Sequence, residues 1–187
     1  MNENERIIDE KIRKLGTKII GRPKEYLLLE KKLKEIYGNN NIILKLIYKG
    51  TRDGDDAKSF HSKCDDLKGS LIVIKSDEEI IFGGFTQEKW RGDCVFKLDD
   101  TSFLFSFYPL KIFDIKKSKR AIYCNKNYGP SFGSITLAVN NNYFINGGWC
   151  CSSYLSNFDN YDNDYEINNG INEFKIQEME IYQVIAE

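Results

Sequence analysis

The chain has only one histidine, His61, among its 187 residues, and its net charge is −1. A single histidine excludes a metal site built from several histidines. A nearly neutral chain has no overall attraction to nucleic acid or to an anionic membrane, so we expect neither nucleic-acid binding nor direct membrane insertion. No apolar run approaches the ~20 residues that a membrane-spanning helix needs, and the polar, acidic start of the sequence is unlike a signal peptide. We therefore expect a cytoplasmic protein without cofactors.

The five cysteines are odd in number and lie scattered in apolar segments, which favours a reduced setting with mostly buried thiols. Cys150 and Cys151 are adjacent, so they suit neither a usual disulfide nor the spacing of a zinc site. On a strand, alternation would point one of them inward and the other outward. An exposed thiol there is our candidate for a redox-sensing or peroxide-scavenging role.

His61 lies three residues before Cys64, which suggests the hypothesis of an activated thiol nucleophile. On a helix, however, Cys64 shares its face with Phe60 and Ala57, and this predicts a buried, inert thiol. We expect no enzyme activity from this pair.

Apolar residues make up 41% of the chain and aromatic residues 13%, which suits one soluble domain with a core built mainly from strands. Apolar spacing predicts two amphipathic N-terminal helices, over 5–15 and 23–37, and the first should bury Ile7, Ile8, Ile12 and Leu15. Short apolar runs between turn-forming residues predict strands over 42–48, 70–75, 79–85, 102–108, 121–124, 134–139, 143–146 and 174–185. So many short strands indicate an α+β, mainly β protein: a two-sheet antiparallel β-sandwich with peripheral helices.

Several short motifs follow one another in a fixed order after residue 41. They are LIYKGTRDG with AKSFHSKCD (46–54 and 57–65), IFGG (81–84) followed by Trp90, FLFSF (103–107), GPSFG (129–133) and EMEIYQV (178–184). In this order and spacing they resemble the TLDc domain, the module of the oxidation-resistance proteins. The resemblance covers about residues 42–185. We therefore divide the chain into an N-terminal helical segment, 1–41, that packs on a TLDc domain, 42–187.

The resemblance implies a β-sandwich with no established catalytic residues. Members of the family are linked to protection against oxidative stress, and several are linked to the vacuolar proton pump, whose cytosolic sector the domain binds. We expect a non-catalytic protein-interaction domain with such a partner. Two alternatives remain open: a cysteine-dependent peroxide-scavenging or redox-sensing protein, and a calcium-responsive adaptor using the acidic loop 157–172, although this loop lacks the EF-hand spacing.

The glycines of two motifs have a structural interpretation. Gly83 and Gly84 lie inside an apolar strand, which indicates a bulge or a close approach of another backbone. In the GPSFG motif, which ends in Phe132 and Gly133, Pro130 fixes its own φ. Gly129 and Gly133 permit a positive φ that other residues resist. The motif therefore predicts a turn that defines the fold.

Glu178 and Glu180 alternate in the apolar closing strand, where carboxylates are costly unless they are paired or hydrogen-bonded. One interpretation is an internal ion pair with a lysine or an arginine, for which Arg52 is the suggested residue. The other is an acidic patch for a binding partner. On the second interpretation, the partner-binding candidates are these two acids with Gly83, Gly84 and Trp90, supported by exposed aromatic side chains near the glycine pair and near Cys150–Cys151.

Overall fold

The computed structural model describes the chain except for residues 1–2, 18, 118, 134–136, 151–156 and 159–165. Its helices are α1 (Glu3–Leu15), α2 (Pro23–Tyr37), α3 (Gly50–Asp53), α4 (Ala57–Cys64) and α5 (Tyr143–Asn146), with a 3-10 turn, η1 (Glu166–Asn168). Its strands are β1 (Ile42–Lys49), β2 (Ser70–Ser76), β3 (Ile81–Thr86), β4 (Val95–Leu98), β5 (Phe103–Phe107), β6 (Leu110–Asp114), β7 (Arg120–Cys124), β8 (Ser131–Phe132), β9 (Leu137–Val139), β10 (Gly148–Cys150), β11 (Glu173–Phe174) and β12 (Ile176–Ala186).

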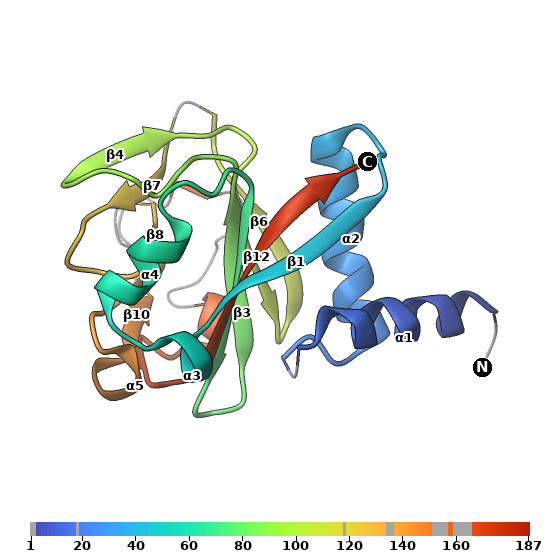
Figure 1. Ribbon diagram of the computed structural model, residues 1–187, viewed down its shortest axis with the longest axis horizontal. Coiled ribbons are helices and arrows are strands. Elements are labelled where there is room, and N and C mark those ends of the chain that lie inside the picture. The colour runs from blue at the N-terminus through green and yellow to red at the C-terminus, as the bar shows by residue number, and fades with distance from the viewer. Residues whose placement is uncertain (1–2, 18, 118, 134–136, 151–156, 159–165) are drawn as a thin grey trace.

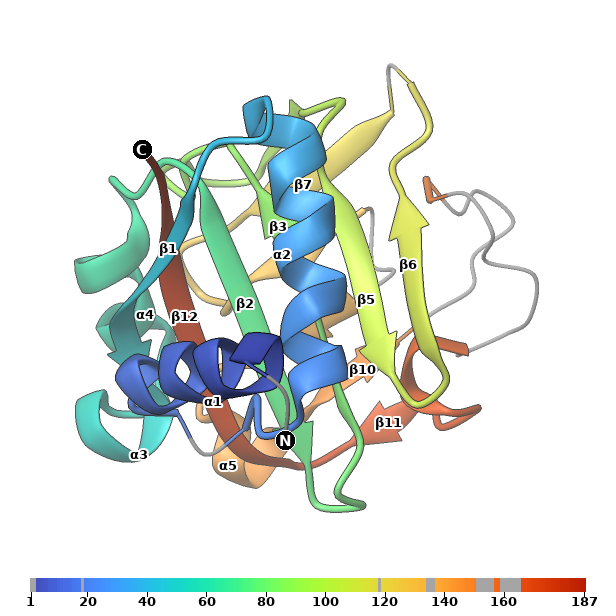
Figure 2. The same cartoon turned by 90° about the vertical axis from the view of Figure 1, so that its right-hand side faces the viewer.

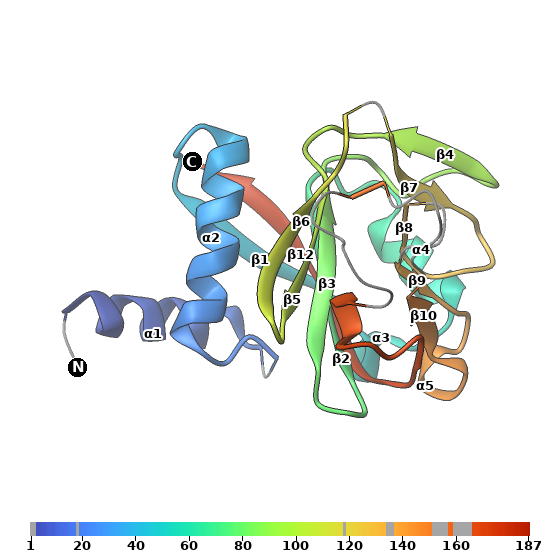
Figure 3. The ribbon, with the colours of Figure 1, turned by 180° about the vertical axis from the view of Figure 1, so that it is seen from behind.

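The strands form two antiparallel sheets of six strands each. Sheet A has the order β1-β12-β2-β3-β5-β6, and sheet B has the order β11-β10-β9-β8-β7-β4. The sheets stack face to face, and α1 and α2 lie on the outer side of sheet A (Figures 1 and 3). This arrangement confirms the predicted fold class, a two-sheet antiparallel sandwich with peripheral helices and two N-terminal helices.

Sheet A is covered on both faces. Leu29 and Leu33 of α2 are fully buried in an apolar cluster with Phe85, Phe103 and Phe105 of sheet A, and α2 crosses that face of the sheet (Figure 2). A second cluster fills the space between the sheets. Because both sides of β2 and β5 are buried, their sequences are continuous apolar runs rather than alternating ones. The division of the chain at residue 41 stays a prediction.

Helix α1 packs less completely than α2. Ile8, Ile12 and Leu15 are partly buried against the same cluster, as predicted. Ile7 is 46% exposed, so the prediction that it lies on the buried face was wrong. The apolar stripe of α1 is thus narrower than the sequence pattern suggested.

The segment 143–146, predicted as a strand, is the short helix α5. Its first backbone N–H groups bond to one distant residue: Tyr143 N donates to Asp55 O at 3.1 Å, and Phe144 N donates to Asp55 Oδ2 at 3.2 Å. Gly147 N then closes the turn by donating to Tyr143 O at 2.7 Å. A contact far away in sequence therefore overrides the local strand preference of these residues.

Candidate functional site

Gly83 and Gly84 lie in the middle of β3, where the pairing register with β2 runs without a shift. A Cβ atom on Gly83 would overlap the carbonyl oxygen of Ile72. A Cβ atom on Gly84 would lie 2.8 Å from Cζ of Phe132 and 2.8 Å from Cδ2 of Leu104. The predicted close approach is confirmed, and no bulge occurs at this point. Gly84 lets the two sheets come together, because Phe132 belongs to sheet B.

The ring of Phe132 fills the space left by Gly84 and connects to further motif residues. It packs edge-on against Trp90, with 5.5 Å between ring centroids, and Trp90 in turn packs edge-on against Phe60 at 5.7 Å. Trp90 Nε1 donates to Ser70 Oγ at 2.8 Å, and the exposed fraction of Trp90 is only 1%. Motif residues that are far apart in sequence therefore meet in one buried aromatic cluster.

The turn-forming motif is only partly as predicted. Gly133 has a φ of 64°, as expected. Gly129 is not among the glycines with positive φ, so it does not use this conformational freedom. Its lack of a side chain instead makes room for Val139, whose Cγ1 would lie 3.0 Å from an added Cβ. Pro130 is buried, and its carbonyl accepts from Val139 N at 3.2 Å.

Glu180 is fully buried, and its carboxylate is satisfied from three directions. Lys49 Nζ lies 2.9 Å from Oε1. Tyr182 OH donates to Oε2 at 2.6 Å, and the hydroxyl of Thr17 donates to the same oxygen. Thr17 lies in the connection between α1 and α2, so this acid joins the N-terminal segment to the sandwich. The structural interpretation holds for Glu180, with Lys49 as the partner.

Glu178 lies near the same lysine, at 3.7 Å, with its side chain 12% exposed. It accepts from Thr51 N at 3.2 Å and from Thr51 Oγ1 at 2.6 Å. The suggested partner Arg52 instead contacts Asp53, with Nη2 2.7 Å from Oδ2. The prediction of Arg52 as the internal partner was therefore wrong. A role of the two acids in binding a partner stays a prediction.

Identifiable contacts shift the pKa values of the titrating groups around these acids. The hydrogen bond to Glu180 raises the pKa of Lys49, so the ammonium form is favoured. Burial, together with the negative charge of Glu180, raises the pKa of Tyr182 well above its usual range. The hydrogen bond from Arg52 lowers the pKa of Asp53. These pKa shifts favour the charged forms of Lys49 and Asp53 and the neutral form of Tyr182.

The described cysteines give little support to the predicted reactive thiol at Cys150 or Cys151. Cys150 is 0% exposed, and Cys151 lies outside the described residues. Cys64 is also fully buried, as predicted, and burial raises its pKa far above the usual value. Burial raises the pKa of Cys124 to about 11. Cys94 is exposed, and no sequence pattern pointed to it.

Both ring nitrogens of His61 lie within hydrogen-bonding distance of oxygen acceptors. Nδ1 lies 2.6 Å from Asp65 Oδ1, and Nε2 lies 3.0 Å from the carbonyl oxygens of Asn125 and Tyr128. The imidazole thus ties α4 to the segment after β7, and both of its nitrogens face oxygen atoms and not the Cys64 thiol. The described residues hold no group of three or more His, Cys, Asp or Glu side chains placed for a metal ion. Residues 159–165 of the acidic loop 157–172 lie outside them.

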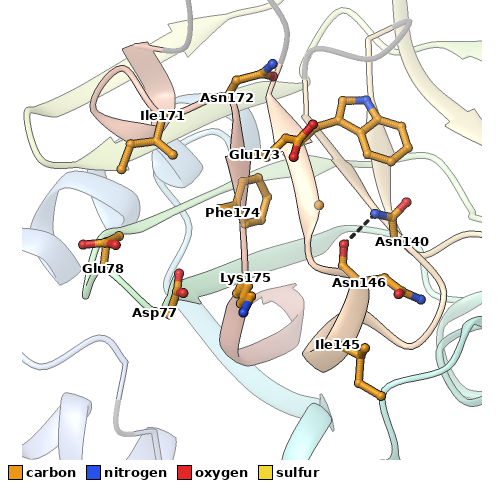
Figure 4. A pocket seen from close by; sticks show the side chains of 12 residues that line it. Asp77, Glu78, Asn140, Ile145, Asn146, Ile171, Asn172, Glu173, Phe174 and Lys175 are labelled. Atoms are coloured by element: carbon orange, nitrogen blue, oxygen red, sulfur yellow. Dashed lines mark hydrogen bonds between the residues drawn. The ribbon is translucent and has the colours of Figure 1, made fainter.

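An open cleft of about 720 Å³ lies where the chain passes from sheet B to sheet A. Its lining contains β11, the turn between β2 and β3, and α5, and none of these segments was predicted as part of a site. Figure 4 shows Glu173 and Phe174 in the middle, Asp77 and Glu78 on one side, and Asn146 on the other. The predicted partner-binding residues lie elsewhere: Gly83, Gly84, Trp90 and Glu180 are buried.

Three neighbouring exposed apolar side chains lie on β4, the outermost strand of sheet B. Val95, Phe96 and Leu98 of β4 are 44%, 38% and 60% exposed. One side of Phe96 is covered by Arg120, whose guanidinium carbon lies 4.2 Å from the ring centroid. None of the helices in the described part of the chain has the length and apolar character needed to cross a membrane.

The family model of the TLDc domain matches residues 15–185. This span contains both sheets and α2, so it covers nearly all of the chain described above. The chain belongs to the TLDc family, which is associated with oxidation resistance. A comparison with curated proteins gives no match.

Proposed function

We propose that this protein is a non-catalytic protein-interaction domain that acts in oxidative-stress resistance in the cytoplasm, with the cytosolic sector of the vacuolar proton pump as its partner. Membership of the TLDc family supports the link to oxidation resistance. The pump is the partner that the family resemblance implies.

The observation that carries the proposal is the position of the motif residues. Gly84, Phe132 and Trp90 meet in the core, and Glu180 lies in an internal ion pair. Residues used in this way maintain the fold and are not free to act on a substrate. The sandwich is then a scaffold, and its contribution is the surface that it presents.

A direct test uses the full chain and the purified cytosolic sector of the vacuolar proton pump. We expect saturable binding by biolayer interferometry, together with a change in ATP hydrolysis when the chain is added to assembled pump. The side chain of Leu98 on β4 is 60% exposed. The variant Leu98→Ser therefore tests whether this apolar strand contributes to binding of the pump sector. Absence of binding by the unmodified chain would refute the pump as partner.

The rival function, peroxide consumption through cysteine, is tested separately. Cys94 is the exposed thiol among the described cysteines, so Cys94→Ser is the first variant, and replacement of all five cysteines is the second. We expect the unmodified chain to show no catalytic turnover of hydrogen peroxide with a thiol reductant, and both variants to bind the pump as before. Turnover that disappears in either variant would overturn the non-catalytic function.

A further inference from the structure

We propose that the cleft beside β11 binds an extended segment of a partner protein that carries an arginine side chain between aliphatic residues. The proposal rests on the interaction function proposed above and assigns it a site and a ligand chemistry. Three features carry it: an aromatic–carboxylate pair, an edge of β11 that no described residue pairs with, and an excess of negative charge.

The aromatic–carboxylate pair consists of Trp149 and Glu173. They lie directly opposite each other on β10 and β11, and Cys150 N donates to Asn172 O at 2.8 Å. Because hydrogen-bonded and non-hydrogen-bonded pairs alternate in an antiparallel ladder, Trp149 and Glu173 form a non-hydrogen-bonded pair with closely spaced side chains on one face. An indole beside a carboxylate suits a planar guanidinium, which can stack on the ring and pair with the acid.

The same register leaves a backbone edge open. In a non-hydrogen-bonded pair, the N–H and C=O groups of Glu173 point away from β10. Strand β11 is the last strand of sheet B, and within the described part of the chain no residue bonds to these two groups. An extended peptide can bond to them as a short added strand.

The charge of the cleft favours a cationic ligand. Its lining includes the carboxylates of Asp77, Glu78 and Glu173 and a single ammonium group, that of Lys175. Among the described residues, none forms an ion pair with any of the three acids. The cleft therefore has net negative charge, which attracts a basic segment and makes binding sensitive to salt.

The sides of the cleft carry aliphatic side chains that suit the peptide residues on either side of the arginine. Ile171 lies on the side of the acidic turn, and Ile145, which is 78% exposed, lies on the opposite side (Figure 4). Two aliphatic side chains flanking the central strand can contact aliphatic residues on either side of the arginine. Side-chain amides such as that of Asn172 supply hydrogen bonds to the peptide backbone.

The test uses the ¹⁵N-labelled full chain and the blocked peptide acetyl-Ala-Ile-Arg-Ile-Ala-amide. We expect saturable shifts of the Trp149 indole N–H and the Glu173 amide signals. The same peptide with citrulline in place of arginine keeps the shape but lacks the charge, and it should bind about tenfold more weakly. Equal binding of the two peptides, or shifts confined to other parts of the sandwich, would overturn the proposal.

Variants locate the interaction on the protein. Glu173→Gln should weaken binding of the arginine peptide about tenfold. Glu88→Gln changes an acid outside the cleft whose side chain is 45% exposed; it is the matched control and should leave binding unchanged. A melting temperature equal to that of the unmodified chain excludes misfolding as the cause. Maltotriose is titrated in parallel, and shifts of Trp149 by this sugar without shifts by the peptide would reassign the cleft to carbohydrate.

Binding of the pump sector by the same variants separates the two proposals. If the unmodified chain binds the pump but not the arginine peptide, the cleft proposal fails and the interaction function stands. If it binds the arginine peptide but not the pump, the pump as partner fails while the cleft proposal stands.

Discussion

The two sheets have the same number of strands but differ in how they are buried and how long their strands are. Sheet A has strands of five to eleven residues and is covered by helices on one face and by sheet B on the other. In sheet B no strand has more than five described residues, and β4 is largely exposed. We infer that sheet A carries most of the stability, whereas sheet B and its connections supply the surface available for binding.

The largest expected effect comes from the closest contact within sheet A. Gly83→Ala would force Cβ into the carbonyl oxygen of Ile72, so β2 and β3 would have to separate. We expect a loss above about 5 kcal/mol, enough to unfold a typical domain. Gly21→Ala is the control because no atom lies within 4 Å of its added Cβ. Urea unfolding compares the two, and a Gly83→Ala variant as stable as the control would contradict the structure.

Truncating one aromatic ring in each sheet tests the comparison directly. Phe105 is fully buried in sheet A, and Phe105→Ala should cost about 3–5 kcal/mol through loss of burial and creation of a cavity. Phe96 in sheet B is 38% exposed and contacts Arg120, so Phe96→Ala should cost about 1 kcal/mol. Denaturant unfolding midpoints measure the loss of stability in both variants. Equal losses would refute the unequal roles of the sheets.

A third prediction concerns the ion pair that joins β1 to β12. Lys49→Met leaves the carboxylate of Glu180 buried without its cation, which should cost about 3 kcal/mol. The control is Lys126→Met, which removes a lysine that is 68% exposed and paired with Asp93, and it should leave the midpoint unchanged. Thermal unfolding measures both. No change for Lys49→Met would mean that Glu180 is satisfied by its hydroxyl partners alone.

The smallest expected effect is a pH dependence at the edge of sheet A. Contacts from Arg52 lower the pKa of Asp53 in the folded chain, so its stabilising effect is present above the unfolded pKa of about 3.9 and is lost as the pH falls below it. Asp53→Asn should therefore reduce stability at pH 7, and the difference from the unmodified chain should disappear in acid. Denaturant curves across this range test it, and a difference that persists to low pH would argue against titration of Asp53.

The sequence predicts sheet A better than sheet B, and the reason lies in burial. Runs such as 70–76 and 103–107 are buried on both faces, so their apolar character is continuous and easily recognised. Strands such as β8 and β11 contain two residues each, too few to establish any periodicity. The helix at 143–146 depends on Asp55, which local sequence cannot predict.

Some functional residues could likewise be recognised from the sequence, whereas others are brought together only by the fold. The motif residues Gly84, Trp90 and Phe132 were recognisable because the core requires them. The sequence pointed to aromatic side chains near Cys150, which include Trp149. Its pairing with Glu173 depends on the register between β10 and β11, and no motif marks Glu173. Lys49 was missed as the partner of Glu180 because that contact needs the two strands to lie side by side.

The position of β12 determines when this fold can form during synthesis. This strand lies between β1 and β2 in sheet A, although nearly all of the described elements separate it from β1 in sequence. As the polypeptide leaves the ribosome, β1 and the face beneath α2 must wait for residues 176–186 before they gain their neighbour. Such long-range pairing slows folding and leaves apolar strand edges exposed to aggregation in the interval. We expect the nascent chain to depend on chaperones until β12 has been made.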